Sequence, residues 1–590
     1  MNTSEPPPPP IGESDAGPLQ VGAGIDFTDP NSRLAPFYLR ASHLIAIAFL
    51  AVVFFFFGVA TQLAHTDVWG HLKYGAWIVQ HRALPEHELF SPFSDPTQMY
   101  WNFQWLSQVV FYLCYHAGDL LAGGDELHRT AGGVEMLRTL HGLLITLKVA
   151  FLLLAMRSST RSLPLAITGA AMYIVLGQGF NRIERPQVFG EVFFALLLWL
   201  VSGLGLPRWS ILSIPLLFIV WANCHGSFLV GFVMLGAVCV GRIIEAAWDA
   251  KADEHWLQSS WLQHGFLGLM LAPLAVGVCN PHGWQIYPGI LQLAKHPNIR
   301  TVSEWTPLDF SQPTGGHWIY LGTLMVVVLS QIISPRPLRF SRVLVLIPFA
   351  VGPLFQQRMI IWWMLVWPWL VVDLWHDAAA VVPRFWRGLA SVASFRKTLI
   401  GVMLVLIGIS WSGFFQFLIW REPRPLKKPG TDPSVWPIAV SVTHATVWPI
   451  AMQLKEGTGL PVLADALKGY PHQRFQGRIL AQDMLADYLV WSLPEKAPVL
   501  VYNHAHVFPE TVWQDQITVL AGRPSWDAVL GRYQVNLVVF DPVMWPELAH
   551  RLRDDSAWRV IIDEGQNPTN DRRPDAFRGK LLVAVRKQPV

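Results

Sequence analysis

The sequence predicts a polytopic α-helical membrane protein with about eleven transmembrane helices and a small C-terminal α/β domain. Of its 590 residues, 52% are hydrophobic and only 14% are charged, and the mean hydropathy is +0.34. Soluble globular proteins carry roughly 25% charged residues, so most of this chain belongs in a bilayer. Long apolar segments stop near residue 422, and the composition beyond is that of a soluble domain.

Residues 1–40 are predicted to form a disordered cytoplasmic tail. They include the run Pro6 to Pro10 and lack apolar periodicity. The apolar segment that follows, Ser42 to Ala64, is long enough to cross a bilayer as a helix and has no cleavage-site pattern. We therefore expect a retained signal-anchor helix rather than a removable signal peptide.

Ten further apolar segments complete the predicted transmembrane domain, residues 41–422. They are 134–156, 163–180, 187–206, 209–224, 226–246, 263–279, 317–333, 343–356, 359–375 and 398–420. The segment 104–122 is interrupted by His116 and Asp119 and is rich in aromatic residues. If it is only an interfacial or re-entrant helix, most loop Lys and Arg residues share the side of the N-terminus, as the positive-inside rule favours. This topology predicts a cytoplasmic N-terminus and an extracytoplasmic C-terminus in a bacterial inner membrane.

The C-terminal part is predicted to comprise a linker, 423–455, and a soluble α/β domain, 456–590. Apolar, β-branched runs alternate there with amphipathic segments, which is typical of strands and helices. Those runs are 478–481, 498–502, 536–540, 558–562 and 580–585. The polar residues Asp483, Asp487, His504, His506 and Asp541 could form a site, or they could be ordinary polar residues at strand ends. We expect this domain to cover or dock onto the membrane site.

Charge and cysteine content exclude several classes of function. The formal net charge of +3 is too small to favour nucleic-acid binding. The four cysteines lie in or beside apolar segments, and none has the spacing of a metal site or a disulfide framework. They are expected to pack as small apolar side chains.

The predicted outer first loop, 65–133, begins with a candidate catalytic carboxylate. Asp67 leaves the first span at a position where an ionised side chain is costly unless it meets water or a partner. His71 follows four residues later and shares its face if the chain is helical there. Asp67 could act as a general base on an acceptor hydroxyl, or it could be a helix-end polar group solvated at the interface.

Arginines at the outer ends of later segments are candidates for binding a phosphate. Arg182, Glu184 and Arg185 precede the segment 187–206, and Arg358 lies between two apolar segments against the local charge bias. The guanidinium group offers a rigid fork of donors and stays ionised, which suits phosphate oxygens. Anchoring to lipid headgroups is the alternative for these side chains.

Two histidines and one further carboxylate are expected on the same outer face. His225 and His282 follow predicted helices, and Glu304 lies in the loop 280–316. A lone histidine is more often a hydrogen-bonded structural residue than a ligand. If both converged with Asp67, a site for a divalent metal or for proton transfer would be possible. Glu304 could be a second carboxylate of the site or a turn anchor.

These features resemble the GT-C superfamily of polyprenyl-phosphate-sugar-dependent glycosyltransferases. Its members include protein O-mannosyltransferases and related bacterial enzymes such as lipid A aminoarabinose transferases. The resemblance lies in the acidic residue after the first span, the long outer first loop, the motif around Arg182, Glu184 and Arg185 after the third span, and the C-terminal extracytoplasmic domain.

The first-loop motif departs from the pattern of that superfamily. Members often carry two adjacent acidic residues, whereas Asp67 stands between a threonine and a valine. A second carboxylate therefore comes from Glu86, Glu88 or Glu184, or is absent. The sequence motifs at 67–72, 221–226 and 280–283 are similar to those of a poorly characterised bacterial subgroup.

The resemblance implies a groove that is open to the outer face and to the bilayer. A polyprenyl-phosphate-sugar donor would enter from membrane lipid, and Asp67 would activate an acceptor hydroxyl on a glycan, a lipid or a protein. Arginines would hold the phosphate and stabilise its charge as it leaves. In this interpretation the catalytic residues are Asp67 and Glu184, and the substrate-binding residues are His71, Arg182, Arg185, His225, His282, Glu304 and Arg358.

Three other interpretations place polar residues on a similar scaffold. A transporter or flippase usually has ionisable groups near the bilayer midplane and internal repeats, and no clear repeat is present here. A non-catalytic scaffold would use the C-terminal domain to bind partners. An oligosaccharide ligase of related architecture should have a large late outer loop, and 280–316 is modest in length.

Overall fold

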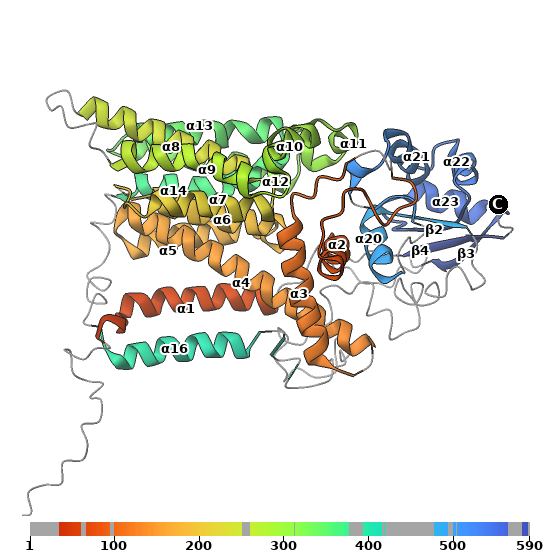
Figure 1. The fold of residues 1–590 in the computed structure, drawn as a ribbon, viewed down its shortest axis with the longest axis horizontal. Coiled ribbons are helices and arrows are strands. Elements are labelled where there is room, and N and C mark those ends of the chain that lie inside the picture. Colours follow the sequence, from red (N-terminus) through yellow and green to blue (C-terminus); the bar gives the residue numbers. More distant parts are fainter. Residues whose placement is uncertain are drawn as a thin grey trace, which may run out of the picture.

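Helices form one end of the molecule and a small mixed domain forms the other (Figure 1). The predicted linker 423–455 and residues 1–34 of the predicted tail lie outside the residues that the structure describes. The computed structural model describes residues 35–60, 67–94, 99–124, 126–203, 205–249, 260–311, 313–376, 393–412, 414, 415, 418, 477–493, 499–502, 504–563 and 581–587.

Each of the eleven apolar segments coincides with a helix. The first is α1 (Ala41–Phe55), which continues into a π-helical turn (Phe56–Ala60). The other ten are α4 (Glu126–Thr160), α5 (Leu163–Leu176), α6 (Gln187–Val201), α7 (Ser210–Cys224), α8 (Phe228–Asp249), α9 (Phe266–Cys279), α12 (Gly315–Ile333), α13 (Phe340–Phe355), α14 (Ile360–Leu374) and α16 (Phe395–Ser410). The predicted class of polytopic helical protein is confirmed.

Fewer helices than eleven have the length and composition of a complete span. Four of the described helices do, within α1 with its turn, α4, α8 and α12, and a fifth is obtained if α9 and α10 (Ile286–Lys295), bent by 115°, count as one. The remaining apolar helices are shorter than the roughly 20 residues that cross a bilayer. The number of complete spans and their orientation therefore stay predictions.

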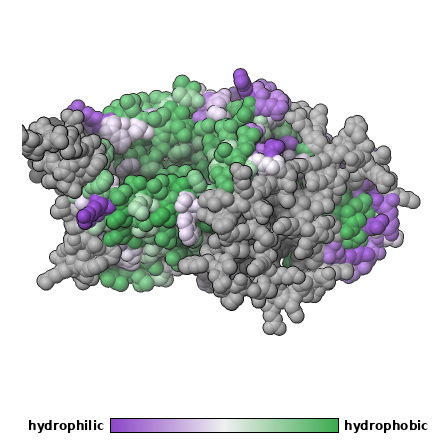
Figure 2. All heavy atoms as spheres, turned by 90° about the horizontal axis from the view of Figure 1, so that it is seen from below, coloured by the Kyte–Doolittle hydropathy of each residue, from purple (hydrophilic) through white to green (hydrophobic). Residues whose placement is uncertain are grey.

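The surface of the bundle is apolar, as expected for lipid contact. On the face shown in Figure 2, hydrophobic residues cover the helical bundle and polar residues lie towards its two ends. Large apolar side chains such as Leu212, Val278 and Ile333 are exposed on different helices. By contrast, α14 buries almost every residue, including Trp363 and Trp367, so it lies in the centre of the bundle.

Two helices of the first loop lie between the bundle and the C-terminal domain. They are α2 (Val68–His81) and α3 (Trp105–Ala122), and Figure 1 shows α3 running steeply across the direction of the bundle helices. The interfacial position expected for 104–122 stays a prediction. α2 and α3 pack closely because Gly75 has no side chain: a Cβ there would lie 2.2 Å from the carbonyl oxygen of Gln108.

The C-terminal domain contains a four-stranded mixed sheet in the order β1-β2-β4-β3. β1 pairs in parallel with β2, and β4 pairs antiparallel with both β2 and β3. Four predicted strands are confirmed, while the fifth, 498–502, contributes only a bridge from Val499 to Ile479 among the described residues. The elements are β1 (Arg478–Ala481), α20 (Asp483–Ser492), the 3-10 helix η11 (Ala505–Val507), α21 (Glu510–Leu520), α22 (Trp526–Arg532), β2 (Val535–Phe540), α23 (Pro546–Asp554), β3 (Trp558–Asp563) and β4 (Leu582–Arg586).

Buried polar contacts join this domain to the first loop. The hydroxyl of Tyr502 donates to Glu88 Oε1 at 2.5 Å and lies 2.8 Å from the hydroxyl of Tyr74 in α2. Lys73 Nζ donates to the carbonyl oxygen of Leu493 at 2.9 Å. The domain therefore docks on the helix that begins at Asp67.

The loop after α10 makes a second docking contact. In the short helix α11 (Pro297–Arg300), the amide of Asn298 donates to the carbonyl oxygens of Ala505 at 2.8 Å and Phe508 at 2.9 Å. Asn298 is completely buried. Both segments that dock the domain thus also carry candidate site residues.

Candidate functional site

Three charged residues from distant parts of the sequence form one cluster. Asp67 lies at the start of α2, Arg185 in the loop before α6, and Glu304 in the 3-10 helix η7 (Ser303–Trp305). Arg185 Nε is 2.9 Å from Asp67 Oδ2, and Arg185 Nη1 donates to both carboxylate oxygens of Glu304, at 2.7 and 2.9 Å. Arg185 therefore bridges two carboxylates.

A second arginine, Arg358, has a neutral partner. It lies in the 3-10 helix η8 (Gln357–Met359), and its Nε donates to Gln187 Oε1 at 2.8 Å. The guanidinium carbon lies 5.1 Å from the ring centroid of Trp305, within cation–π range. Among the described residues, no carboxylate forms an ion pair with Arg358, although the charge of Glu304 acts on it.

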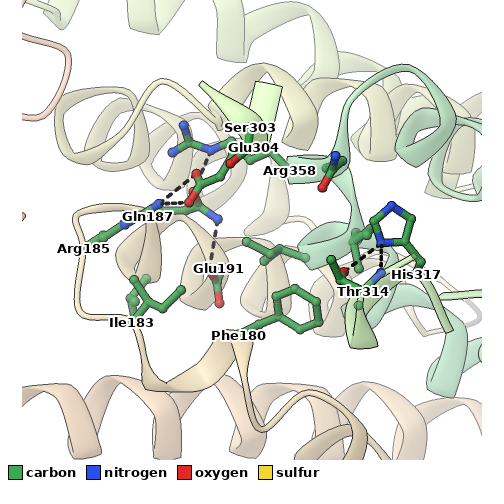
Figure 3. Close-up of a pocket in the computed structure, with 15 residues that line it drawn as sticks. Phe180, Ile183, Arg185, Gln187, Glu191, Ser303, Glu304, Thr314, His317 and Arg358 are labelled. Carbon is green, nitrogen blue, oxygen red and sulfur yellow. Dashed lines mark hydrogen bonds and ion pairs between the residues drawn. The ribbon is translucent and has the colours of Figure 1, made fainter. Parts of the chain in front are cut away.

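Both arginines line the same pocket (Figure 3). Its cavity volume is about 180 Å³. Polar side chains of Gln187, Glu191 and Glu304 join the arginines in the lining, together with apolar and further polar residues. The apolar and remaining lining residues are Phe180, Ile183, Val188, Ser303, Thr314, Gly316, His317, Gln357, Ile360 and Ile361. A pocket with charged and apolar walls suits an amphiphilic ligand.

The charges of the cluster favour the ionised form of Glu304. Burial alone would raise the pKa of Glu304, but the positive charges of Arg185 and Arg358 outweigh it and hold that pKa below its usual value. Burial would lower the pKa of Arg185, yet Asp67 and Glu304 hold it above its ordinary value. The bridge is therefore an ion triad at neutral pH.

Two predicted histidines lie close to the cluster. His71 Nδ1 is 3.2 Å from Gln108 Nε2, and its ring centroid is 5.3 Å from that of His504 in the C-terminal domain. His225 Nδ1 accepts from the backbone N–H of Ser227 at 3.1 Å, which is a turn contact. The charges of Arg185 and Arg358 act on His225, so it is close to the pocket without lining it.

Three other predicted site residues are not brought to the pocket. Arg182 is exposed and Glu184 is buried, and neither belongs to the pocket lining. The carboxylate of Glu184 has no hydrogen-bond partner among the described residues, and burial raises its pKa well above the usual value. His282 packs against Trp101. The roles proposed for these residues remain predictions.

The pocket also contains residues that the sequence analysis did not select. Glu191 of α6 lines it and lies 2.5 Å from Nζ of Lys148, a fully buried residue of α4. The side chain of Gln187 connects Glu191 to Arg358. A signal was present, because an ionisable residue inside an apolar segment is a functional candidate by default. Opposite charges within two predicted spans, 134–156 and 187–206, point to such a pair.

No metal centre is evident in the described part of the chain. Nowhere among those residues do three or more His, Cys, Asp or Glu side chains gather in a way that could hold a metal ion. The histidines near Asp67 contact aromatic rings and amides instead.

No protein-family model and no curated protein matches the chain. Two solved structures are similar to the chain at low identity. The archaeal oligosaccharyltransferase AglB from Archaeoglobus fulgidus, in complex with an inhibitory peptide and a dolichol-phosphate, has a TM-score of 0.47 and 11% identity over 87% of this chain and 70% of that one. ArnT from Cupriavidus metallidurans, bound to undecaprenyl phosphate, has a TM-score of 0.45 and 13% identity over 92% and 97%. Neither match assigns a site residue to the chain.

Proposed function

We propose that the protein transfers a sugar from a polyprenyl-phosphate-linked donor to an acceptor hydroxyl at the outer face of the cytoplasmic membrane. One observation carries this proposal. Arg358, which forms no ion pair with a carboxylate of the described residues, lines a partly apolar pocket together with Arg185, the ion-pair partner of Asp67. The reaction uses a cation to bind the donor phosphate, a base to take the proton of the acceptor hydroxyl, and a pocket that accepts an amphiphilic donor.

The two arginines have different roles in this proposal. Arg358 binds the donor phosphate, because a guanidinium with a single neutral partner can turn its remaining donors to phosphate oxygens. Arg185 already shares its charge between Asp67 and Glu304, so it mainly positions Asp67 and assists Arg358 in binding the phosphate.

Asp67 is the general base. Its ion pair with Arg185 keeps the carboxylate ionised and oriented. It takes the proton of the acceptor hydroxyl while that oxygen bonds to the anomeric carbon, and the bond from that carbon to the phosphate oxygen breaks. Arg358 stabilises the charge that grows on the departing phosphate. A single displacement of this kind inverts the anomeric centre.

The C-terminal domain lies on the acceptor side of the proposed reaction. Its His504 faces His71, one helical turn after Asp67, and its α20 packs on α2. A glycan, lipid or protein acceptor would approach Asp67 from the side of this domain, and the donor would approach from the pocket side.

Photo-crosslinking tests the proposal. A polyprenyl phosphate that carries a photoreactive group beside its phosphate should label peptides containing residues 303–305 and 357–361, and an excess of undecaprenyl phosphate should suppress the label. Labelling that is confined to lipid-facing helices and unaffected by the competitor would contradict the proposed donor site.

A further inference from the structure

A fully buried ion pair lies behind the proposed donor pocket. Lys148 is in the middle of α4, and its side chain is 0% exposed, while that of Glu191 in α6 is 5% exposed. Their nitrogen and oxygen lie 2.5 Å apart. An unpaired charge inside an apolar segment is costly, so each residue depends on the other. A pair of apolar residues would fill the same volume without this cost.

One arm of the network fixes the loop that carries Arg185. Lys148 Nζ also donates to Asn181 Oδ1 at 2.7 Å, and the hydroxyl of Tyr173 donates to the same oxygen at 2.8 Å. The ring Nε2 of His141 lies 2.9 Å from the backbone carbonyl oxygen of Asn181. Asn181 is buried and stands four residues before Arg185, so three side chains hold the start of this loop.

The other arm reaches Arg358. Gln187 Nε2 donates to Glu191 Oε1 at 3.3 Å, and Gln187 Oε1 accepts from Arg358 Nε at 2.8 Å. A glutamine amide can donate with one end and accept with the other, so the orientation fixed by Glu191 presents the oxygen to Arg358. Figure 3 shows Gln187, Glu191 and Arg358 along one side of the pocket.

We propose that Lys148 is a positioning residue for phosphate binding: it neutralises Glu191, which orients Gln187 and thereby Arg358, and it fixes the Arg185 loop through Asn181. This inference rests on the proposed function, since it deepens the same donor site. Without Lys148, the carboxylate of Glu191 would compete with the donor phosphate for Arg358, on which its charge already acts. Lys148 itself does not line the pocket and touches no substrate.

A double-mutant cycle measures this effect on binding. The full chain in nanodiscs is titrated with undecaprenyl phosphate for wild type, Lys148→Met, Glu191→Gln and the double variant. We expect Lys148→Met to weaken binding about tenfold, a typical coupling within one network. The double variant should bind within about threefold of wild type, because it removes the competing carboxylate and keeps an amide partner for Gln187.

A purely structural pair gives a different result. In that case thermal stability falls, but the folded fraction of Lys148→Met binds undecaprenyl phosphate as tightly as wild type, which overturns the inference. Equal weakening in Lys148→Met and in the double variant overturns it as well, because no competition by Glu191 would then exist.

Two further measurements keep the test decisive. If Lys148→Met does not fold, Tyr173→Phe removes one donor to Asn181 without leaving a buried charge. It should weaken binding about threefold, and unchanged binding would overturn the inference. If wild type itself does not bind undecaprenyl phosphate, the proposed function fails, which is distinct from a wild type that binds and variants that bind equally well.

Discussion

Arg342 and Arg358 lie at opposite ends of α13 and have opposite surroundings. Arg342 is 4% exposed, with its Nε 3.4 Å from Asp373, its Nη2 donating to Ser159 at 2.8 Å and its guanidinium 3.3 Å from the ring centroid of Trp369. Arg358 has one neutral amide as hydrogen-bond partner and a pocket beside it. The first cation is saturated by the protein, and the second is not.

This difference shows which charges can serve a ligand. A buried cation whose donors and charge are satisfied joins helices, and removing one partner is costly because the other is left uncompensated. A cation held by a neutral group keeps much of its attraction for an anion. The partners of a charged residue therefore indicate whether it can bind a ligand better than the number of charges at that end of the bundle does.

The largest effect is expected from replacing the carboxylate of Asp67, compared with the same replacement of Asp373 at the other end of the bundle. Asp67→Asn should lower sugar transfer by on the order of 10²–10⁴, the usual contribution of a general base, while binding of undecaprenyl phosphate stays close to wild type. Asp373→Asn is the matched control, because Asp373 pairs with Arg342 at the other end. Transfer is measured per amount of folded protein. Equal activity of Asp67→Asn and wild type would remove Asp67 from the mechanism.

The arginines themselves give the next effect. Arg358→Leu should weaken binding of undecaprenyl phosphate about 10- to 100-fold, since a hydrogen bond to a charged group contributes about 1.5–3 kcal/mol. Arg342→Leu should lower the melting temperature and leave binding unchanged. If the two variants lost binding equally, the contrast between a saturated and an available cation would be wrong.

A smaller effect is expected at the contact between the two domains. Asn298→Ala leaves the carbonyl oxygens of Ala505 and Phe508 without their buried donor, which costs about 1–3 kcal/mol. Hydrogen exchange around η11 should become faster, while exchange within the bundle is unaffected. Ser311→Ala, at an exposed position of the same loop, is the control. Unchanged exchange in Asn298→Ala would mean that other contacts dominate docking.

Sequence patterns predicted the helices and most strands because burial leaves a local signature. The apolar run Leu537 to Phe540 of β2 and the long segments of the bundle could be recognised without knowing their neighbours. The charged cluster was predicted only as separate candidates. Asp67, Arg185 and Glu304 are far apart in sequence, and nothing local shows that one guanidinium bridges two carboxylates.

Docking of the C-terminal domain was expected from the sequence, but the residues that make the contact could not be predicted, for another reason. The sequence allows two interpretations of His504, a site residue or a polar residue at a strand end. They differ only in which residues of the folded protein contact its side chain. In the structure it packs against His71 and Tyr74 of α2. A side chain whose meaning depends on a partner in another domain cannot be assigned from its own surroundings in the chain.

The surroundings of His504 predict the smallest effect, a dependence of docking on pH. Burial, followed by the neighbouring His71, lowers the pKa of His504 to about 3, while Asp67 opposes this shift and His506 packs beside it. The docked state therefore binds fewer protons than the undocked state, so docking is stable above pH 6.5 and weakens as the pH falls towards 3. At pH 5.5 this residue lowers the stability of the docked state by about 1 kcal/mol.

Hydrogen exchange at pH 7 and pH 5.5 tests this dependence, with rates corrected for the intrinsic effect of pH. We expect faster opening of η11 at the lower pH in wild type and a smaller difference in His504→Gln. An identical pH dependence in that variant would assign the effect to another group.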